Sequence, residues 1–60
     1  ILAFYAVVLY DFAAEQPGDL SLSPGEKITI LDDTDESGWW KGRKADGSEG
    51  VFPSNFVQRS

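Results

Sequence analysis

Short stretches of alternating apolar and polar residues run along much of this chain, and such alternation predicts β-strands. The clearest stretch is residues 27–30, in which Ile28 and Ile30 share one face and should enter the core. Residues 5–10 are apolar and rich in β-favouring types, which predicts a first strand. The remaining strands are expected at residues 39–44, 49–52 and 57–59.

The segments between these stretches carry turn residues, and no stretch keeps helical periodicity over three turns. Residues 11–25 hold two prolines and two glycines around Leu20 and Leu22, which predicts an irregular hairpin with both leucines inward. Residues 53–55 have room for a single helical turn. We therefore expect an all-β fold at residues 5–59, a small five-stranded barrel of two orthogonal antiparallel sheets with one short 3-10 turn. Residues 1–4 form an apolar N-terminal lead-in.

The aromatic residues are more numerous than a small core can hold, since the chain has two Trp, two Tyr and four Phe. A domain of this size buries only about 60% of the surface of its unfolded chain. The strand pattern turns four rings outward beside Pro53, and an exposed strip of this kind indicates a binding surface. These four are Tyr10, Phe12, Trp39 and Phe56. Trp40 lies on the opposite strand face and is expected to pack over neighbouring side chains.

The residue inventory argues against catalysis, because the chain has neither cysteine nor histidine. It therefore lacks a thiol nucleophile, an imidazole base and a thiolate metal site. The carboxylates lie in loops of a domain too small to enclose a substrate, so we expect no enzyme activity and no cofactor. Residues 33–38 mimic the start of a calcium loop, but position twelve of that loop would be Lys44 in place of an acidic ligand. No metal site is expected.

The net charge of −5 favours basic partners and repels nucleic acid and anionic lipid. The longest apolar run ends at Tyr10, well short of the ~20 residues that span a membrane. We accordingly expect no nucleic-acid partner, no direct membrane binding and a monomeric domain. A small domain without cysteine fits the reducing cytoplasm.

Three motifs appear in a specific order: the run Val8 to Phe12, the pair Trp39-Trp40, and the segment Gly50 to Phe56. With the intervening Asp-Leu-Ser and Pro-Gly-Glu triplets, the chain resembles the Src homology 3 family from about residue 5 to residue 59. The resemblance implies a noncatalytic module that binds proline-rich PxxP peptides in the polyproline II conformation. It also implies a place within a larger signalling, endocytic or cytoskeletal adaptor protein.

The same resemblance assigns residues to the ligand pockets. One slot for an X-Pro pair would lie between Tyr10 and Phe56, with Phe12 along its outer edge. The next would be walled by Tyr10, Trp39, Pro53 and Asn55. The third pocket would hold an arginine or lysine of the ligand at Asp19, and Glu15 and Glu36 would add to its negative field.

Two departures from the family pattern bear on function, since Phe12 and Phe56 stand where the family usually has tyrosine. Each missing hydroxyl removes a hydrogen bond worth about 0.5–1.5 kcal/mol, so we expect weakened or altered ligand preference. The alternative function is binding of a folded partner such as ubiquitin through the Phe56 hydrophobic patch. In the core, Gly42 and Phe52 replace a common alanine and a common aliphatic residue, a pair of changes that can compensate in volume.

Overall fold

The computed structural model describes residues 4–60, and within this range it contains strands and a single 3-10 helix. The elements are β1 (Phe4–Val8), β2 (Lys27–Asp32), β3 (Trp39–Arg43), β4 (Glu49–Pro53), η1 (Ser54–Phe56) and β5 (Val57–Arg59). The expected all-β class, five strands and short 3-10 turn are confirmed. The first three residues of the predicted lead-in lie outside the described residues, and Phe4 begins β1. No helix between residues 4 and 60 is long and apolar enough to cross a membrane.

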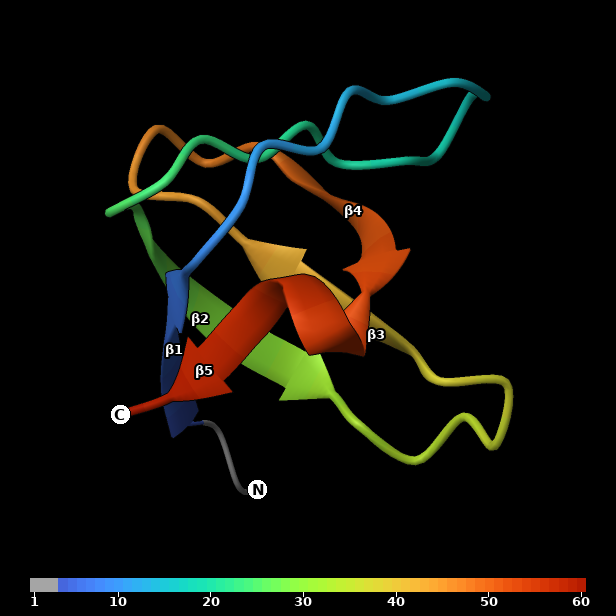
Figure 1. Ribbon diagram of the computed structural model, residues 1–60. Coiled ribbons are helices and arrows are strands. Elements are labelled where there is room, and N and C mark those ends of the chain that lie inside the picture. Colours follow the sequence, from blue (N-terminus) through green and yellow to red (C-terminus); the bar gives the residue numbers. More distant parts are fainter. Residues whose placement is uncertain (1–3) are drawn as a thin grey trace.

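The strands pair in the order β4-β3-β2-β1-β5, and every ladder between them is antiparallel. The sheet is strongly bent, and its two edge strands, β4 and β5, are consecutive in the chain with only η1 between them (Figure 1). The register of β2 against β3 shifts between Ile30 and Asp32, which is an irregularity of the bulge kind. This bend lets a few short strands surround one core.

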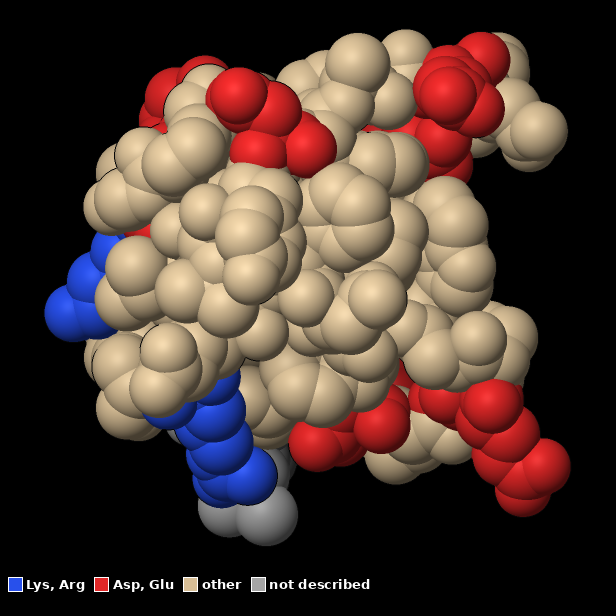
Figure 2. Space-filling view, in the orientation of Figure 1, with Lys and Arg blue, Asp and Glu red and all other residues tan. Residues whose placement is uncertain are grey.

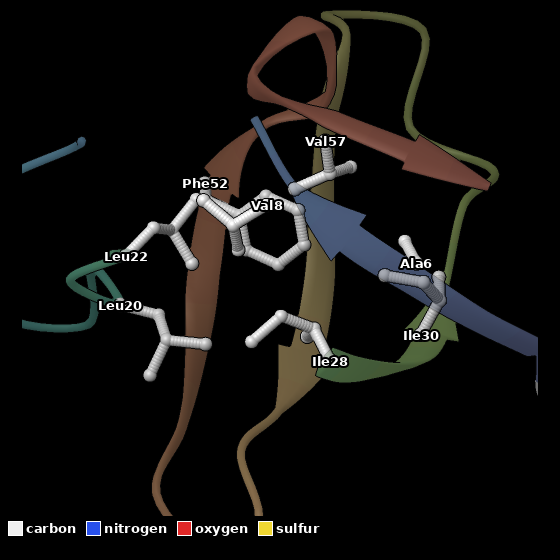
Figure 3. Close-up of a cluster of buried hydrophobic side chains, with 8 residues drawn as sticks. All are labelled: Ala6, Val8, Leu20, Leu22, Ile28, Ile30, Phe52 and Val57. Atoms are coloured by element: carbon white, nitrogen blue, oxygen red, sulfur yellow. The ribbon is translucent and has the colours of Figure 1, made fainter. Parts of the chain in front are cut away.

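The core gathers the inward side chains of the bent sheet and of the loop between β1 and β2 (Figure 3). Ile28 and Ile30 are 0% and 1% exposed, as their alternation predicted, and Leu20 and Leu22 are also buried. The other members are Ala6, Val8, Phe52 and Val57. Trp40 packs against this cluster, as expected.

Strand β1 ends at Val8, two residues before the predicted end at Tyr10. The backbone N–H of Leu9 donates to the carbonyl of Phe56 in η1 at 2.8 Å, so the chain leaves the β1–β2 ladder there. Beyond this point, the loop of residues 9–26 is tied down by isolated bridges from Phe12 to Leu22 and from Asp19 to Val51. The early end of β1 thereby carries Tyr10 toward η1 and away from the sheet.

Candidate functional site

Four aromatic side chains form a continuous series, which we name the aromatic row: Tyr10, Phe56, Phe12 and Trp39. The centroids of Tyr10 and Phe56 lie 6.1 Å apart, those of Phe56 and Phe12 5.7 Å apart, and those of Phe12 and Trp39 5.8 Å apart. Each pair meets edge to face, with interplanar angles between 73° and 88°. This arrangement is favourable for aromatic pairs.

The members of the row come from segments that are far apart in sequence. Tyr10 and Phe12 lie in the loop after β1, Trp39 is the first residue of β3, and Phe56 ends η1. Tyr10 is 60% exposed, whereas the other three rings are half-buried. Phe12 and Phe56 also pack against the core, so the row has a rigid base. The strand pattern predicted that all four rings face outward. Tyr10 is largely exposed, as predicted, whereas the other three rings are only partly exposed.

Pro53 and Asn55 border the row from the β4–η1 segment. Pro53 is the ladder partner of Trp39, and the backbone N–H of Ser54 donates to the carbonyl of Gly38 at 2.8 Å. Pro53 therefore lies directly opposite Trp39 across the β3–β4 ladder. Asn55 is exposed on η1, where its side-chain amide can donate to or accept from a ligand.

At the Trp39 end of the row lies an open hollow of about 410 Å³, which we name the acidic hollow. Trp39 and Val51 form its apolar wall, and the carboxylates of Glu15, Asp19 and Asp35 line it from two loops. Figure 2 shows acidic side chains over the two loops that project on the right of Figure 1. Of the three acidic residues predicted from the sequence, Glu15 and Asp19 line the hollow and Glu36 does not, although it is adjacent to Asp35.

Asp19 is held by its own loop. Its Oδ2 accepts hydrogen bonds from the backbone N–H groups of Glu15 and Gln16, each at 3.2 Å. Among the described residues these bonds use Oδ2 alone, which leaves Oδ1 for a cation. Asp19 therefore shapes the loop and contributes charge to the hollow.

Asp35, which the sequence analysis did not place in the site, is oriented by an Asx turn. Its Oδ1 accepts from the backbone N–H of Ser37 at 2.9 Å, and this hydrogen bond lowers the pKa of the Asp35 carboxyl below its usual value of 3.8. Asp35 is therefore ionised at neutral pH. An Asp followed two residues later by Ser is the sequence signal that favours such a turn and could have identified it.

The site offers an apolar row, an indole N–H donor and an end lined by carboxylates. Within residues 4–60, no group of His, Cys, Asp or Glu side chains is arranged to hold a metal ion. The chemistry available is thus the binding of a ligand with apolar rings, backbone carbonyls and a positive charge.

Comparison with known sequences identifies relatives over most of the chain. A family model described as SH3 domain matches residues 7–54. The drebrin-like protein of Dictyostelium discoideum is 54% identical over 54 residues, and protein YSC84 of Saccharomyces cerevisiae is 54% identical over 56 residues. These matches cover 90% and 92% of this chain but only 11% and 12% of the two relatives. The chain thus spans about one-tenth of the length of these curated relatives.

Solved structures agree with the sequence match. The C-terminal SH3 domain of myosin IB from Entamoeba histolytica, bound to EhFP10(GEF) peptide, superimposes with a TM-score of 0.89 at 38% identity and covers 100% of this chain and 97% of that one. The yeast YHH6 SH3 domain gives a TM-score of 0.86 at 50% identity, with 98% and 100% covered. Both the sequence and the fold show that this chain belongs to the SH3 domain family, whose members are noncatalytic binding modules.

Proposed function

We propose that this domain binds proline-rich segments that adopt the polyproline II helix and carry a neighbouring arginine or lysine. The observation that carries the proposal is the unbroken path from the aromatic row into the acidic hollow. Trp39 belongs to both, since it ends the row and walls the hollow. One extended ligand can therefore lay its apolar rings on the row and its cation in the hollow.

The aromatic row suits a ligand that is already extended. A polyproline II helix has three residues per turn and no internal hydrogen bonds, so it docks with little loss of entropy and with its carbonyls free. We assign one X-Pro slot to Tyr10 and Phe56, with Phe12 at its edge, and the next to Tyr10, Trp39, Pro53 and Asn55. The indole N–H of Trp39 and the amide of Asn55 would donate to ligand carbonyls.

The acidic hollow would select the charge of the ligand. A guanidinium can meet carboxylate oxygens in charge-assisted, two-pronged hydrogen bonds, and Asp19 with Asp35 supplies carboxylates from opposite loops. Glu15 lines the same hollow, and Glu36 adds negative charge from the adjacent position in the loop. The peptide bound to the related myosin IB domain supports a peptide as the class of ligand.

We further propose that the domain acts as a monomeric module within a larger cytoplasmic adaptor protein of the signalling, endocytic or cytoskeletal kind. The small share of its relatives' length that the chain covers supports the larger protein, and the myosin IB and drebrin-like relatives support the cytoskeletal setting. A small interface of this type is transient, with an affinity near the micromolar range, about −8 kcal/mol at 1 μM.

Trp39→Ala tests the proposal directly. The domain would be titrated with PxxP peptides carrying arginine at either end, following the amide and indole resonances by NMR. Because Trp39 packs on proline and donates a hydrogen bond, its loss should cost about 2 kcal/mol or more, roughly thirtyfold in Kd. Tyr5→Ala is the matched control, because it removes a half-exposed ring outside the row and should leave Kd unchanged.

The second candidate, a folded partner such as ubiquitin, is favoured by the position of Phe56. Its ring meets both Tyr10 and Phe12 and has no hydroxyl, so the middle of the row is wholly apolar. Ubiquitin would be titrated in parallel with the peptides. If no proline-rich peptide shifts Trp39, Tyr10 or Asn55 at millimolar concentration while ubiquitin shifts Phe56, the polyproline proposal is wrong and the second candidate takes its place.

A further inference from the structure

The loop between β2 and β3 places one carboxylate in the acidic hollow and leaves the next one outside. Asp35 lines the hollow, whereas the adjacent Glu36 does not. Both residues are exposed and both are acidic, so the course of the backbone determines which of them a ligand cation would meet. The backbone feature at this point is a tight turn over residues 35–38.

The turn is closed by two hydrogen bonds onto Asp35. The backbone N–H of Gly38 donates to the carbonyl of Asp35 at 3.3 Å. The backbone N–H of Ser37 donates to the Asp35 Oδ1 atom at 2.9 Å. The carboxylate that lines the hollow is therefore tied to the backbone of its own turn.

Gly38 ends this turn in a conformation that residues with a side chain avoid. Its φ is +88°, in the left-handed region that glycine enters without steric cost. Outside its immediate chain neighbours, a Cβ atom added at Gly38 would find no heavy atom within 4 Å. The constraint at this position is thus the backbone conformation and not a lack of space.

Gly38 also connects the turn to the rest of the site. Its carbonyl accepts a hydrogen bond from the backbone N–H of Ser54, the first residue of η1, at 2.8 Å. The next residue, Trp39, begins β3, lines the acidic hollow and ends the aromatic row. The turn that holds Asp35 is therefore joined both to Trp39 and to the helix that carries Asn55.

We propose that Gly38 is a positioning residue for ligand recognition, because its left-handed backbone sets the turn that holds the Asp35 carboxylate in the acidic hollow beside Trp39. A residue confined to negative φ would redirect the chain there, and either the turn or the hydrogen bond to Ser54 would be lost. The preference of the domain for a positively charged ligand would then weaken. The inference rests on the proposed function, since the charge that it concerns is that of a proline-rich ligand.

The hairpin between β3 and β4 provides a matched control. Gly47 has a φ of +93°, its backbone N–H closes a turn onto the carbonyl of Lys44 at 3.0 Å, and an added Cβ atom would again find no heavy atom within 4 Å. This turn lies at the end of the β3–β4 ladder opposite to Trp39 and Pro53. Alanine at Gly38 and alanine at Gly47 thus impose the same kind of backbone strain, once inside the site and once outside it.

The test compares the variants Gly38→Ala and Gly47→Ala in titrations with two PxxP peptides that differ only in arginine or glutamine at the charged position. The parent domain should prefer the arginine peptide by up to about fivefold, the range for an exposed ion pair. Gly38→Ala should reduce this ratio of Kd values to near one. Gly47→Ala should keep the ratio, although both variants lower the urea midpoint of unfolding by similar amounts. Gly38→Asn should restore part of the preference, because asparagine enters the left-handed region more readily than alanine.

A second readout needs no ligand. The hydrogen bond from Ser37 lowers the pKa of the Asp35 carboxyl below its usual value of 3.8. Followed by NMR of the carboxyl carbon, this pKa should rise toward 3.8 in Gly38→Ala and stay lowered in Gly47→Ala.

Three results would overturn the proposal: an unchanged preference for arginine in Gly38→Ala, an unchanged Asp35 pKa in that variant, or an equal loss of preference in Gly47→Ala. The last result would assign the effect to general destabilisation. All three leave the proposed function intact, because the parent domain still binds the peptides. If no proline-rich peptide binds the parent domain, the proposed function is wrong and the role of Gly38 in recognition falls with it, while the pKa still shows whether Gly38 holds the carboxylate.

Discussion

At the scale of single residues, Gly42 and Phe52 illustrate how neighbouring strands divide the volume of the core. A Cβ atom added at Gly42 would lie 2.8 Å from Cε2 of Phe52 and 2.6 Å from Cγ2 of Ile28. Real Cβ atoms do not approach other atoms so closely, so the missing side chain of Gly42 makes room for the large ring of Phe52. This close approach supports the interpretation that the two residues compensate in volume.

Gly42→Ala should therefore destabilise the domain. Overpacking costs about 1–3 kcal/mol, more than the roughly 0.5–1 kcal/mol that a strand gains on losing a glycine. Adding Phe52→Leu to this variant should recover part of the loss, although Phe52→Leu alone leaves a cavity and destabilises. Urea unfolding of the two single variants and the double variant measures these energies. Strictly additive losses in the double variant would contradict the compensation.

At the scale of elements, the loop of residues 9–26 depends on Asp19 for its shape as well as its charge. Two backbone N–H groups of the loop donate to Asp19 Oδ2. The segment beside Asp19 is clamped to β4, since Leu20 N–H donates to the carbonyl of Val51 and Val51 N–H donates to the carbonyl of Gly18, both at 2.9 Å. One carboxylate thus couples the fold of the loop to the proposed recognition of a cation.

Two substitutions of Asp19 should separate these roles. Asp19→Asn keeps an oxygen acceptor and removes the charge. It should weaken the binding of an arginine-bearing peptide by up to about fivefold, with little change in the stability of the domain. Asp19→Ala removes both and should also lower the free energy of unfolding by about 0.5–1.5 kcal/mol. Calorimetric titration and urea unfolding measure the two effects, and a peptide with glutamine in place of arginine is the control. If Asp19→Asn still prefers arginine over glutamine as strongly as the parent domain, Asp19 does not read the charge.

At the scale of the whole molecule, three exposed aspartates have lowered pKa values because they accept hydrogen bonds in tight turns. Asp32 accepts from the side chain and backbone of Thr34, while Asp35 and Asp46 accept chiefly from the backbone N–H groups of Ser37 and Ser48. Each pKa lies below the usual value of 3.8. The charged forms of these groups are thus favoured in the folded state.

The stability of the domain should consequently fall in acid. A carboxyl whose folded-state pKa is depressed stabilises the fold above its unfolded value of 3.8, and this contribution is lost as the pH falls through the lower folded-state pKa. Thermal unfolding followed from neutral pH to below pH 3 should show the decline. A triple Asp→Asn variant at these positions keeps the acceptors without the charge and should flatten the curve. An unchanged pH dependence in that variant would assign the acid sensitivity to other carboxylates.

Local sequence was sufficient for most of the fold. The alternation at residues 27–30 predicted the burial of Ile28 and Ile30, and residues 57–59 matched β5. Such features depend on a two-residue period that each strand carries by itself, and on turn residues that act on their neighbours. The end of β1 escaped this reasoning because the partner of Leu9 is the carbonyl of Phe56, 47 positions away in the chain.

For the site, the amino-acid sequence was enough to predict that the core cannot hold all the aromatic rings and that acidic residues gather in the loops. The tertiary structure decided that Tyr10, Phe56, Phe12 and Trp39 touch in one series, and that Asp35 lines the acidic hollow while Glu36 does not. The physical reason is that burial and strand period are local properties, whereas the contacts between loops and strands exist only once the sheet has bent around its core.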